Sequence, residues 1–167
     1  MDLTLAPTST IHATCVAVGG WGILLTGPSG SGKSDLALRL IQAPDGKARL
    51  VGDDRIALRQ VENQLVARPA PVLAGRMEVR GVGIIRFDYV PEVVVRLVVA
   101  LTPREEVPRL PEEECHRIFF GMRVPLMKIS PFESSALYKL HLALNEVCRK
   151  QEYHEHGMQE SKRKTGR

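Results

Sequence analysis

The residues best suited to chemistry form one short glycine-rich segment. Residues 27–34 fit the pattern G-x-x-x-x-G-K-[ST] of a phosphate-binding loop. Small residues let consecutive backbone N–H groups surround phosphate oxygens, and a following helix N-terminus adds partial positive charge. In such a loop Lys33 reaches the β- and γ-phosphates and the Ser34 hydroxyl ligates Mg²⁺. The sequence therefore predicts nucleotide binding by all eight residues of this phosphate loop: Gly27, Pro28, Ser29, Gly30, Ser31, Gly32, Lys33 and Ser34.

The flanking residues predict the strand and the helix that a phosphate loop requires. The apolar run 22–26 precedes the loop as a strand, and residues 34–42 follow it as a helix that ends at a Pro-Asp-Gly cluster. Residues 11–18 are rich in β-formers and precede Gly19-Gly20, which predicts a hairpin with strand 21–26. The alternative, a glycine-rich turn with a surface lysine, explains neither the full spacing nor Lys33-Ser34 at the helix start.

Two adjacent carboxylates are candidates for base or metal chemistry. Asp53 and Asp54 directly follow the apolar Leu50-Val51, as acids do at the end of a Walker B strand. Neighbouring strand residues point to opposite sides, so the two carboxylates should differ in role. One would be a base and the other a metal ligand or hydrogen-bond partner. The alternative is a turn in which one Asp caps the next segment.

Glu78 is the third acidic candidate. It lies in residues 74–87, a β-rich segment whose glycines allow close approach of the backbone to a ligand. The alternative is a surface strand glutamate paired with Arg80. Sequence periodicity does not separate these two interpretations.

The remaining elements predict the architecture that holds these groups. Residues 55–60 and 64–68 indicate a hairpin, residues 93–101 a central strand buried on both faces, and residues 115–129 a strand or strand pair. Ser130-Pro131-Phe132-Glu133 predicts a helix start with a capping box, followed by an apolar helical stripe. We expect an α/β P-loop kinase domain: a mixed β-rich sheet, a helix after the phosphate loop and a C-terminal amphipathic helix. The catalytic domain would span 1–150, and 151–167 would be a polar, basic tail.

Length, cysteine content and charge exclude several classes of protein. A chain of 167 residues suits one domain, and the longest apolar run, 93–101, is too short for a bilayer and contains Arg96. Three widely spaced cysteines favour reduced thiols over a disulfide framework. The net charge is +4, but four basic residues and one acidic residue lie in the last ten, so the excess is largely in the tail. We expect a cytoplasmic protein that binds neither nucleic acid nor membrane.

Segments on both sides of the phosphate loop resemble signatures of the bacterial HPr kinase/phosphorylase family. These are residues 50–55, residues 77–85, and Ile11-His12 with His12 twenty-one residues before Lys33. Together they cover roughly residues 11–130. Enzymes of that family phosphorylate a serine of the phosphocarrier HPr and remove the phosphate by phosphorolysis.

The resemblance implies roles for particular residues. The phosphate loop would hold ATP or pyrophosphate, and Ser34 with Glu78 would ligate Mg²⁺. Asp54 would be the general base for phosphorylation and the general acid in the reverse direction. His12, Lys33 and Arg109 would be the other active-site residues, although the spacing from Glu78 to Arg109 is shorter than in the family.

The resemblance also implies partners. This chain resembles the short α-proteobacterial form without the N-terminal domain, whose HPr-like substrate belongs to a nitrogen-related phosphotransferase system, and the family suggests a homo-oligomer, a hexamer. Residues 124–131 lack the glycine and arginine of the segment tied to dephosphorylation, so kinase activity should exceed phosphorylase activity. Two alternatives are a small-molecule P-loop kinase and a non-catalytic nucleotide-binding regulatory module that contacts a sensor kinase.

Overall fold

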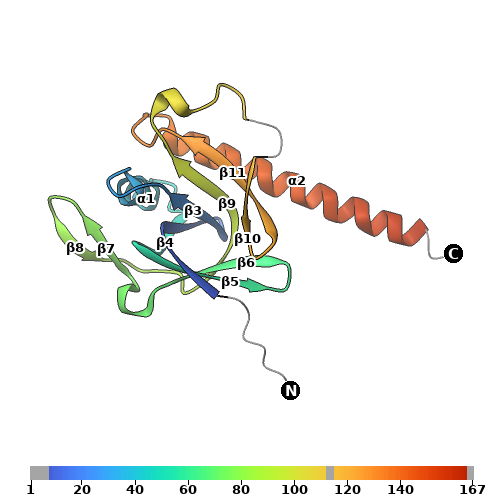
Figure 1. Cartoon of the computed structure of the whole chain (residues 1–167), viewed down its shortest axis with the longest axis horizontal. Coiled ribbons are helices and arrows are strands. Elements are labelled where there is room, and N and C mark those ends of the chain that lie inside the picture. The colour runs from blue at the N-terminus through green and yellow to red at the C-terminus, as the bar shows by residue number, and fades with distance from the viewer. Residues whose placement is uncertain (1–7, 112–114, 165–167) are drawn as a thin grey trace, which may run out of the picture.

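The computed structural model describes residues 8–111 and 115–164, which form a β-rich α/β domain (Figure 1). The predicted fold class is confirmed. In chain order the elements are β1 Thr8–His12, β2 Thr14–Val18, β3 Trp21–Thr26, α1 Lys33–Ile41, β4 Ala48–Gly52, β5 Arg55–Val61, β6 Gln64–Pro69, β7 Arg76–Val79, β8 Gly83–Arg86, β9 Val93–Leu101, β10 His116–Phe119, β11 Met122–Ile129 and α2 Ala136–Lys164, with short 3₁₀ turns at Pro71–Leu73 and Arg104–Glu106.

Strand β9 is the centre of the main sheet, whose order is β1-β5-β6-β9-β3-β2-β4. It pairs in parallel with β3 along its length, antiparallel with β6 at its start, and in parallel with β11 at its end. The hairpins β2–β3, β5–β6 and β10–β11 extend from this strand, and β7–β8 forms a separate two-stranded sheet. The carboxyl ends of β3, β9 and β11 therefore lie at one edge of the sheet, where the phosphate loop begins.

The two faces of the central strands pack into two hydrophobic cores. On one face, Ile23 and Leu25 of β3 pack with residues of both helices. On the other face, Leu24 packs with residues of β5 and β6, which cover that side. Burial on both faces explains why β3 and β9 are apolar almost throughout rather than alternating. It confirms the prediction of a buried central strand at 93–101.

Two predictions about elements need correction. Residues 11–18 are not one strand, because β1 pairs with β5 and β2 pairs with β3 and β4. The C-terminal helix does not begin at Ser130: it begins at Ala136, after turns at 131–135. Those turns are held by other contacts, since Arg39 donates to the Pro131 carbonyl and Lys139 binds the Glu133 carboxylate.

Helix α2 also continues past residue 150, as far as Lys164. Figure 1 shows its later turns extending beyond the rest of the molecule. None of the helices in residues 8–111 and 115–164 combines the length and apolar character that a membrane span requires.

Candidate active site

The phosphate loop connects β3 to α1, and its shape depends on glycines with positive φ. Gly32 immediately precedes the helix with φ 96°, and Gly27 opens the loop with φ 150°. A Cβ at Gly27 would lie 2.7 Å from the Ser31 hydroxyl oxygen, and one at Gly32 would lie 2.9 Å from Cζ of Phe132. Both positions therefore favour glycine for its conformation, and a Cβ at either would also displace a neighbouring side chain. The predicted helix at 34–42 is confirmed to within one residue at each end.

Lys33 lies within the loop rather than extending into solvent. Its side chain is buried, and Nζ donates hydrogen bonds of 2.9 Å to the carbonyl oxygens of Gly27 and Pro28. Burial lowers the pKa of Lys33, and the negative charges of Asp53 and Asp54 partly oppose that effect. The ammonium is thus close to both carboxylates and is held by weak neutral acceptors that a phosphate can replace.

Asp53 connects three elements through one carboxylate oxygen. Its Oδ1 accepts a hydrogen bond of 2.7 Å from Thr14 Oγ1 on β2 and one of 2.9 Å from Ser34 Oγ on α1. Asp53 is buried and Thr14 is fully buried. The arrangement fixes the start of α1 against the end of β4. It also orients the Ser34 hydroxyl toward an acidic group.

Asp54 points to the opposite side, next to His12. The residue has φ 66°, and the Arg55 amide donates to the Asp53 carbonyl across it at 2.8 Å. His12 Nε2 lies 3.2 Å from Asp54 Oδ1, and the side chains are 50% and 63% exposed. The pair borders an open cleft of about 410 Å³, lined by Thr10, Ile11, His12, Asp54 and Arg55. The two aspartate side chains therefore point to different sides, as predicted, although they lie in a bend after β4 and not on a strand. Their different roles stay a prediction.

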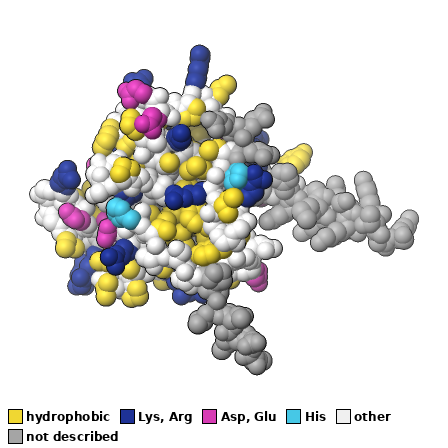
Figure 2. Space-filling view, in the orientation of Figure 1, with side chains coloured by type: hydrophobic (Ala, Val, Ile, Leu, Met, Phe, Trp, Pro, Cys, Tyr) yellow, Lys and Arg dark blue, Asp and Glu magenta, His cyan; other side chains and the backbone are white. Residues whose placement is uncertain are grey.

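The surface around this cleft is polar. On the face shown in Figure 2, histidine, acidic and basic side chains gather toward the left of the molecule, where β1 ends in Figure 1. Hydrophobic side chains occupy more of the centre of the same view. An exposed carboxylate in a polar, open cleft can be approached by a large acceptor such as another protein.

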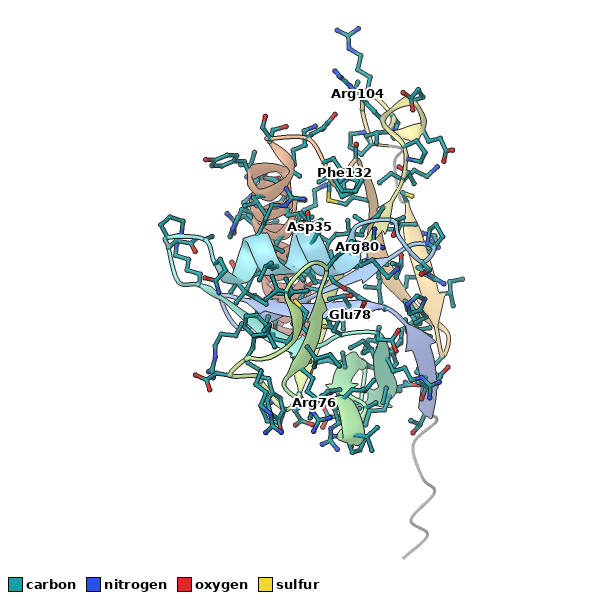
Figure 3. All side chains as sticks on the ribbon, turned by 90° about the vertical axis from the view of Figure 1, so that its left-hand side faces the viewer. Asp35, Arg76, Glu78, Arg80, Arg104 and Phe132 are labelled. Carbon is teal, nitrogen blue, oxygen red and sulfur yellow. The ribbon has the colours of Figure 1, made fainter. Side chains whose placement is uncertain are left out.

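Glu78 lies on the β7–β8 hairpin, which packs beside α1. Figure 3 shows the hairpin with Arg76 at its base, Arg80 near its tip and Glu78 between them. Glu78 is exposed, and within the described residues it forms no ion pair with Arg80. The structure thus does not support the pairing with Arg80, and no hydrogen bond or ion pair among the described residues joins Glu78 to the phosphate loop.

Arg109 lies apart from the groups described above. It is exposed on the loop after β9, and no contact joins it to the phosphate loop or to Asp54 among residues 8–111 and 115–164. That loop does leave from the same edge of the sheet, because Leu101 O lies 3.3 Å from the Cβ position of Gly27. The structure thus brings together His12, Lys33, Ser34 and Asp54, whereas neither Glu78 nor Arg109 forms a hydrogen bond or ion pair with this cluster in the part of the chain that the structure describes.

The oxygen ligands present suit magnesium bound together with phosphates. Within the described ranges no three His, Cys, Asp or Glu side chains form a group that could hold a metal alone. Mg²⁺ prefers hard oxygen ligands and takes only one or two from protein when substrate phosphates supply others. The Ser34 hydroxyl, which donates to Asp53 Oδ1 at 2.9 Å, and the exposed Glu78 carboxylate are such oxygens. The donor set therefore fits Mg²⁺ bound with a nucleotide.

Sequence reasoning missed Thr14 and left the role of Asp53 open. Thr14 is a polar residue in a strand whose other members are apolar, and its hydroxyl needs a partner when buried. That signal was present in the sequence, but its partner is thirty-nine residues away and could not be identified there.

Comparison with known proteins gives a consistent result. Residues 3–164 match the family described as HPr Serine kinase C-terminal domain. The HPr kinase/phosphorylase of Clostridium acetobutylicum is 45% identical over 85 residues, 51% of this chain and 27% of that protein. The corresponding protein of Lactobacillus delbrueckii subsp. bulgaricus is 38% identical over 140 residues, 77% of this chain and 43% of that protein.

A solved structure agrees along nearly the whole chain. The HPr(Ser) kinase/phosphatase from Coxiella burnetii has a TM-score of 0.67 at 29% identity, covering 95% of this chain and 99% of that one. The chain spans less than half the length of the two curated relatives described above. With the family match over 3–164 and the shared fold, this chain belongs to the HPr serine kinase C-terminal domain family.

Proposed function

We propose that this protein transfers the γ-phosphoryl group of ATP to a serine of an HPr-like phosphocarrier protein. The observation that carries the proposal is the divergence of the two aspartates. Asp53 is buried against Ser34 and Thr14, whereas Asp54 is exposed beside His12 in an open cleft. A carboxylate that is near Lys33 yet accessible from solvent suits an acceptor too large to enter a pocket.

The chemistry follows from these positions. Asp54 accepts the proton of the serine hydroxyl, the serine oxygen forms a bond to the γ-phosphorus, and the bond to the β–γ bridging oxygen breaks to release ADP. His12, at hydrogen-bond distance, orients the Asp54 carboxylate. Lys33 exchanges the carbonyls of Gly27 and Pro28 for phosphate oxygens and offsets their charge.

Magnesium would be held by Ser34 and Glu78, with Asp53, itself held by Thr14, accepting the hydrogen bond that positions the Ser34 hydroxyl. When bound, the ion supplies charge neutralisation at the β- and γ-phosphates. Arg109 would join the site from the loop after β9 once the carrier is bound. ATP and a phosphocarrier are both cytoplasmic reactants, so we expect the protein to act there.

The reverse reaction is a second activity of the same site. An orthophosphate oxygen would attack the phosphoserine phosphorus and form the P–O–P bond of pyrophosphate, the bond from phosphorus to the serine oxygen would break, and Asp54 would donate a proton to that oxygen. Residues 124–131 offer only one basic side chain for it, Lys128, which is exposed on β11. Kinase activity should therefore exceed phosphorylase activity. Lys128→Ala should lower pyrophosphate release from the phosphoserine carrier more than it lowers kinase activity.

The decisive experiment is phosphotransfer from labelled ATP to purified HPr-like proteins, followed by mapping of the modified residue. We expect phosphoserine, and we expect Asp54→Asn to lower kcat by about 10²- to 10⁴-fold, the range for general base catalysis. A matched control is Asp45→Asn, because Asp45 also lies near a histidine, with His141 Nε2 3.8 Å from its Oδ2, but outside the site.

Three results would contradict the proposal. A phosphohistidine product would exclude a serine acceptor. Nucleotide binding without transfer to any HPr-like protein would favour a regulatory module, and transfer to a small alcohol alone would favour a small-molecule kinase.

A further inference from the structure

An aromatic ring stands exposed at the end of the phosphate loop. Phe132 is 72% exposed, and its Cζ and Cε1 lie 2.9 Å and 3.2 Å from the position that a Cβ on Gly32 would occupy. Figure 3 shows Phe132 above helix α1, between Asp35 on that helix and Arg104 on the loop after β9. The ring therefore touches the loop on one side and faces solvent on the other.

The segment that carries Phe132 is fixed on both sides. Ser130 and Pro131 are buried, and Arg39 of α1 donates a hydrogen bond to the Pro131 carbonyl. Glu133 binds Lys139, and its Oε1 lies 3.5 Å from Arg104 Nε. Because its neighbours are anchored, the backbone that carries the exposed ring is held in place, which lowers the cost of binding a ligand there.

The position agrees with a general rule for parallel strands. Ligands bind outside the carboxyl ends of such strands, where the loops that follow them meet. The phosphate loop follows β3, and the segment 130–135 follows β11, which runs parallel to β9 and β3. A ligand with phosphates on the loop and a flat ring beyond them matches both features.

We propose that Phe132 is the stacking surface for the base of the nucleotide whose phosphates occupy residues 27–34. This inference rests on the proposed use of a nucleoside triphosphate. The exposed face of a phenylalanine offers no hydrogen bond, and every base has a π-face, so recognition here should depend on stacking. We therefore expect ADP and GDP to bind with affinities within about 5-fold of each other.

The test compares a ligand that has a base with one that lacks it. Phe132→Ala should weaken ADP binding about 5- to 100-fold, as measured by titration calorimetry, since stacking on an aromatic ring contributes that range of affinity. Pyrophosphate binding should be unchanged. Phe132→Tyr should retain ADP affinity. Tyr138→Ala is the matched control, because Tyr138 on α2 is also 72% exposed, and it should change neither affinity.

Two outcomes would overturn the inference. Equal weakening of ADP and pyrophosphate would mean that the ring supports the loop rather than the base, and Phe132→Leu, which keeps most of the packing, would then restore both. Unchanged ADP binding with a raised KM for the carrier would assign the ring to protein docking. If only the kinase proposal is wrong, Phe132→Ala should still weaken ADP binding and leave pyrophosphate binding unchanged, but no phosphotransfer should be observed.

Discussion

The hydrogen bonds of Asp53 allow a quantitative prediction about stability. Its Oδ1 accepts from Thr14 at 2.7 Å and from Ser34 at 2.9 Å. Hydrogen bonds to a charged group contribute about 1.5–3 kcal/mol each, and a buried hydroxyl left unpaired costs about 1–3 kcal/mol. Ser34 is only partly buried and can bind water instead, whereas Thr14 is fully buried and cannot. We expect Asp53→Ala to lower the free energy of unfolding by about 2–4 kcal/mol.

Urea denaturation followed by circular dichroism measures this free energy, and Tm should fall by about 5–15 °C. Thr14→Val removes the hydroxyl that would be left unpaired in Asp53→Ala. The free energy of unfolding of the double variant Thr14→Val/Asp53→Ala should therefore exceed the value expected from adding the two single effects by about 1–2 kcal/mol. Asp54→Asn is the control: that exposed residue has φ 66°, which Asn tolerates, and stability should change by less than about 0.5 kcal/mol. A small loss in Asp53→Ala, or strict additivity in the double variant, would refute the reasoning.

Three further predictions concern single side chains. Lys33→Ala should abolish phosphotransfer. Burial holds the pKa of Lys33 in the folded protein below 10.5, so the unfolded chain binds that proton more tightly, and the free energy of unfolding of the wild type should rise as pH increases toward 10.5. The variant should lack this rise when denaturation is measured at several pH values. Glu78→Gln should raise the Mg²⁺ concentration needed for half-maximal activity, and an unchanged Mg²⁺ titration would make Glu78 an ordinary surface residue. Cys15, fully buried with its thiol pKa raised by that burial, should resist iodoacetamide in the folded protein while Cys115 reacts, as intact mass would report.

Much of the fold could be predicted because local signals and tertiary contacts agree. The phosphate loop and its helix follow from glycine spacing and from residues 33–41, which have both helical propensity and an apolar face. The hairpins β2–β3 and β5–β6 follow from turn residues between β-forming runs. In each case, the pairing partner is close in sequence.

The errors occur where distant contacts outweigh local preference. Ser130-Pro131-Phe132-Glu133 has the composition of a helix start, yet Arg39 and Lys139 bind Pro131 and Glu133 instead. The break at Ala13, between β1 and β2, depends on the different strands with which the two halves pair: β2 pairs with the adjacent β3, whereas β1 pairs with β5, which is distant in sequence. The roles of Asp54, Glu78 and Arg109, and the oligomeric state, stay predictions.

The three partners of β9 have a consequence for how the chain folds. The hairpins β2–β3, β5–β6 and β10–β11 join neighbours in sequence and can form early, within microseconds. Joining them requires β9, which must meet β3 across a long intervening chain, as in the pairing of Thr26 with Ala100. Loop closure of that length is entropically costly, so the transition state should contain β3 docked on β9, and refolding should take about milliseconds to seconds. Substitutions at that junction should slow folding, whereas substitutions on β7–β8 should chiefly speed unfolding.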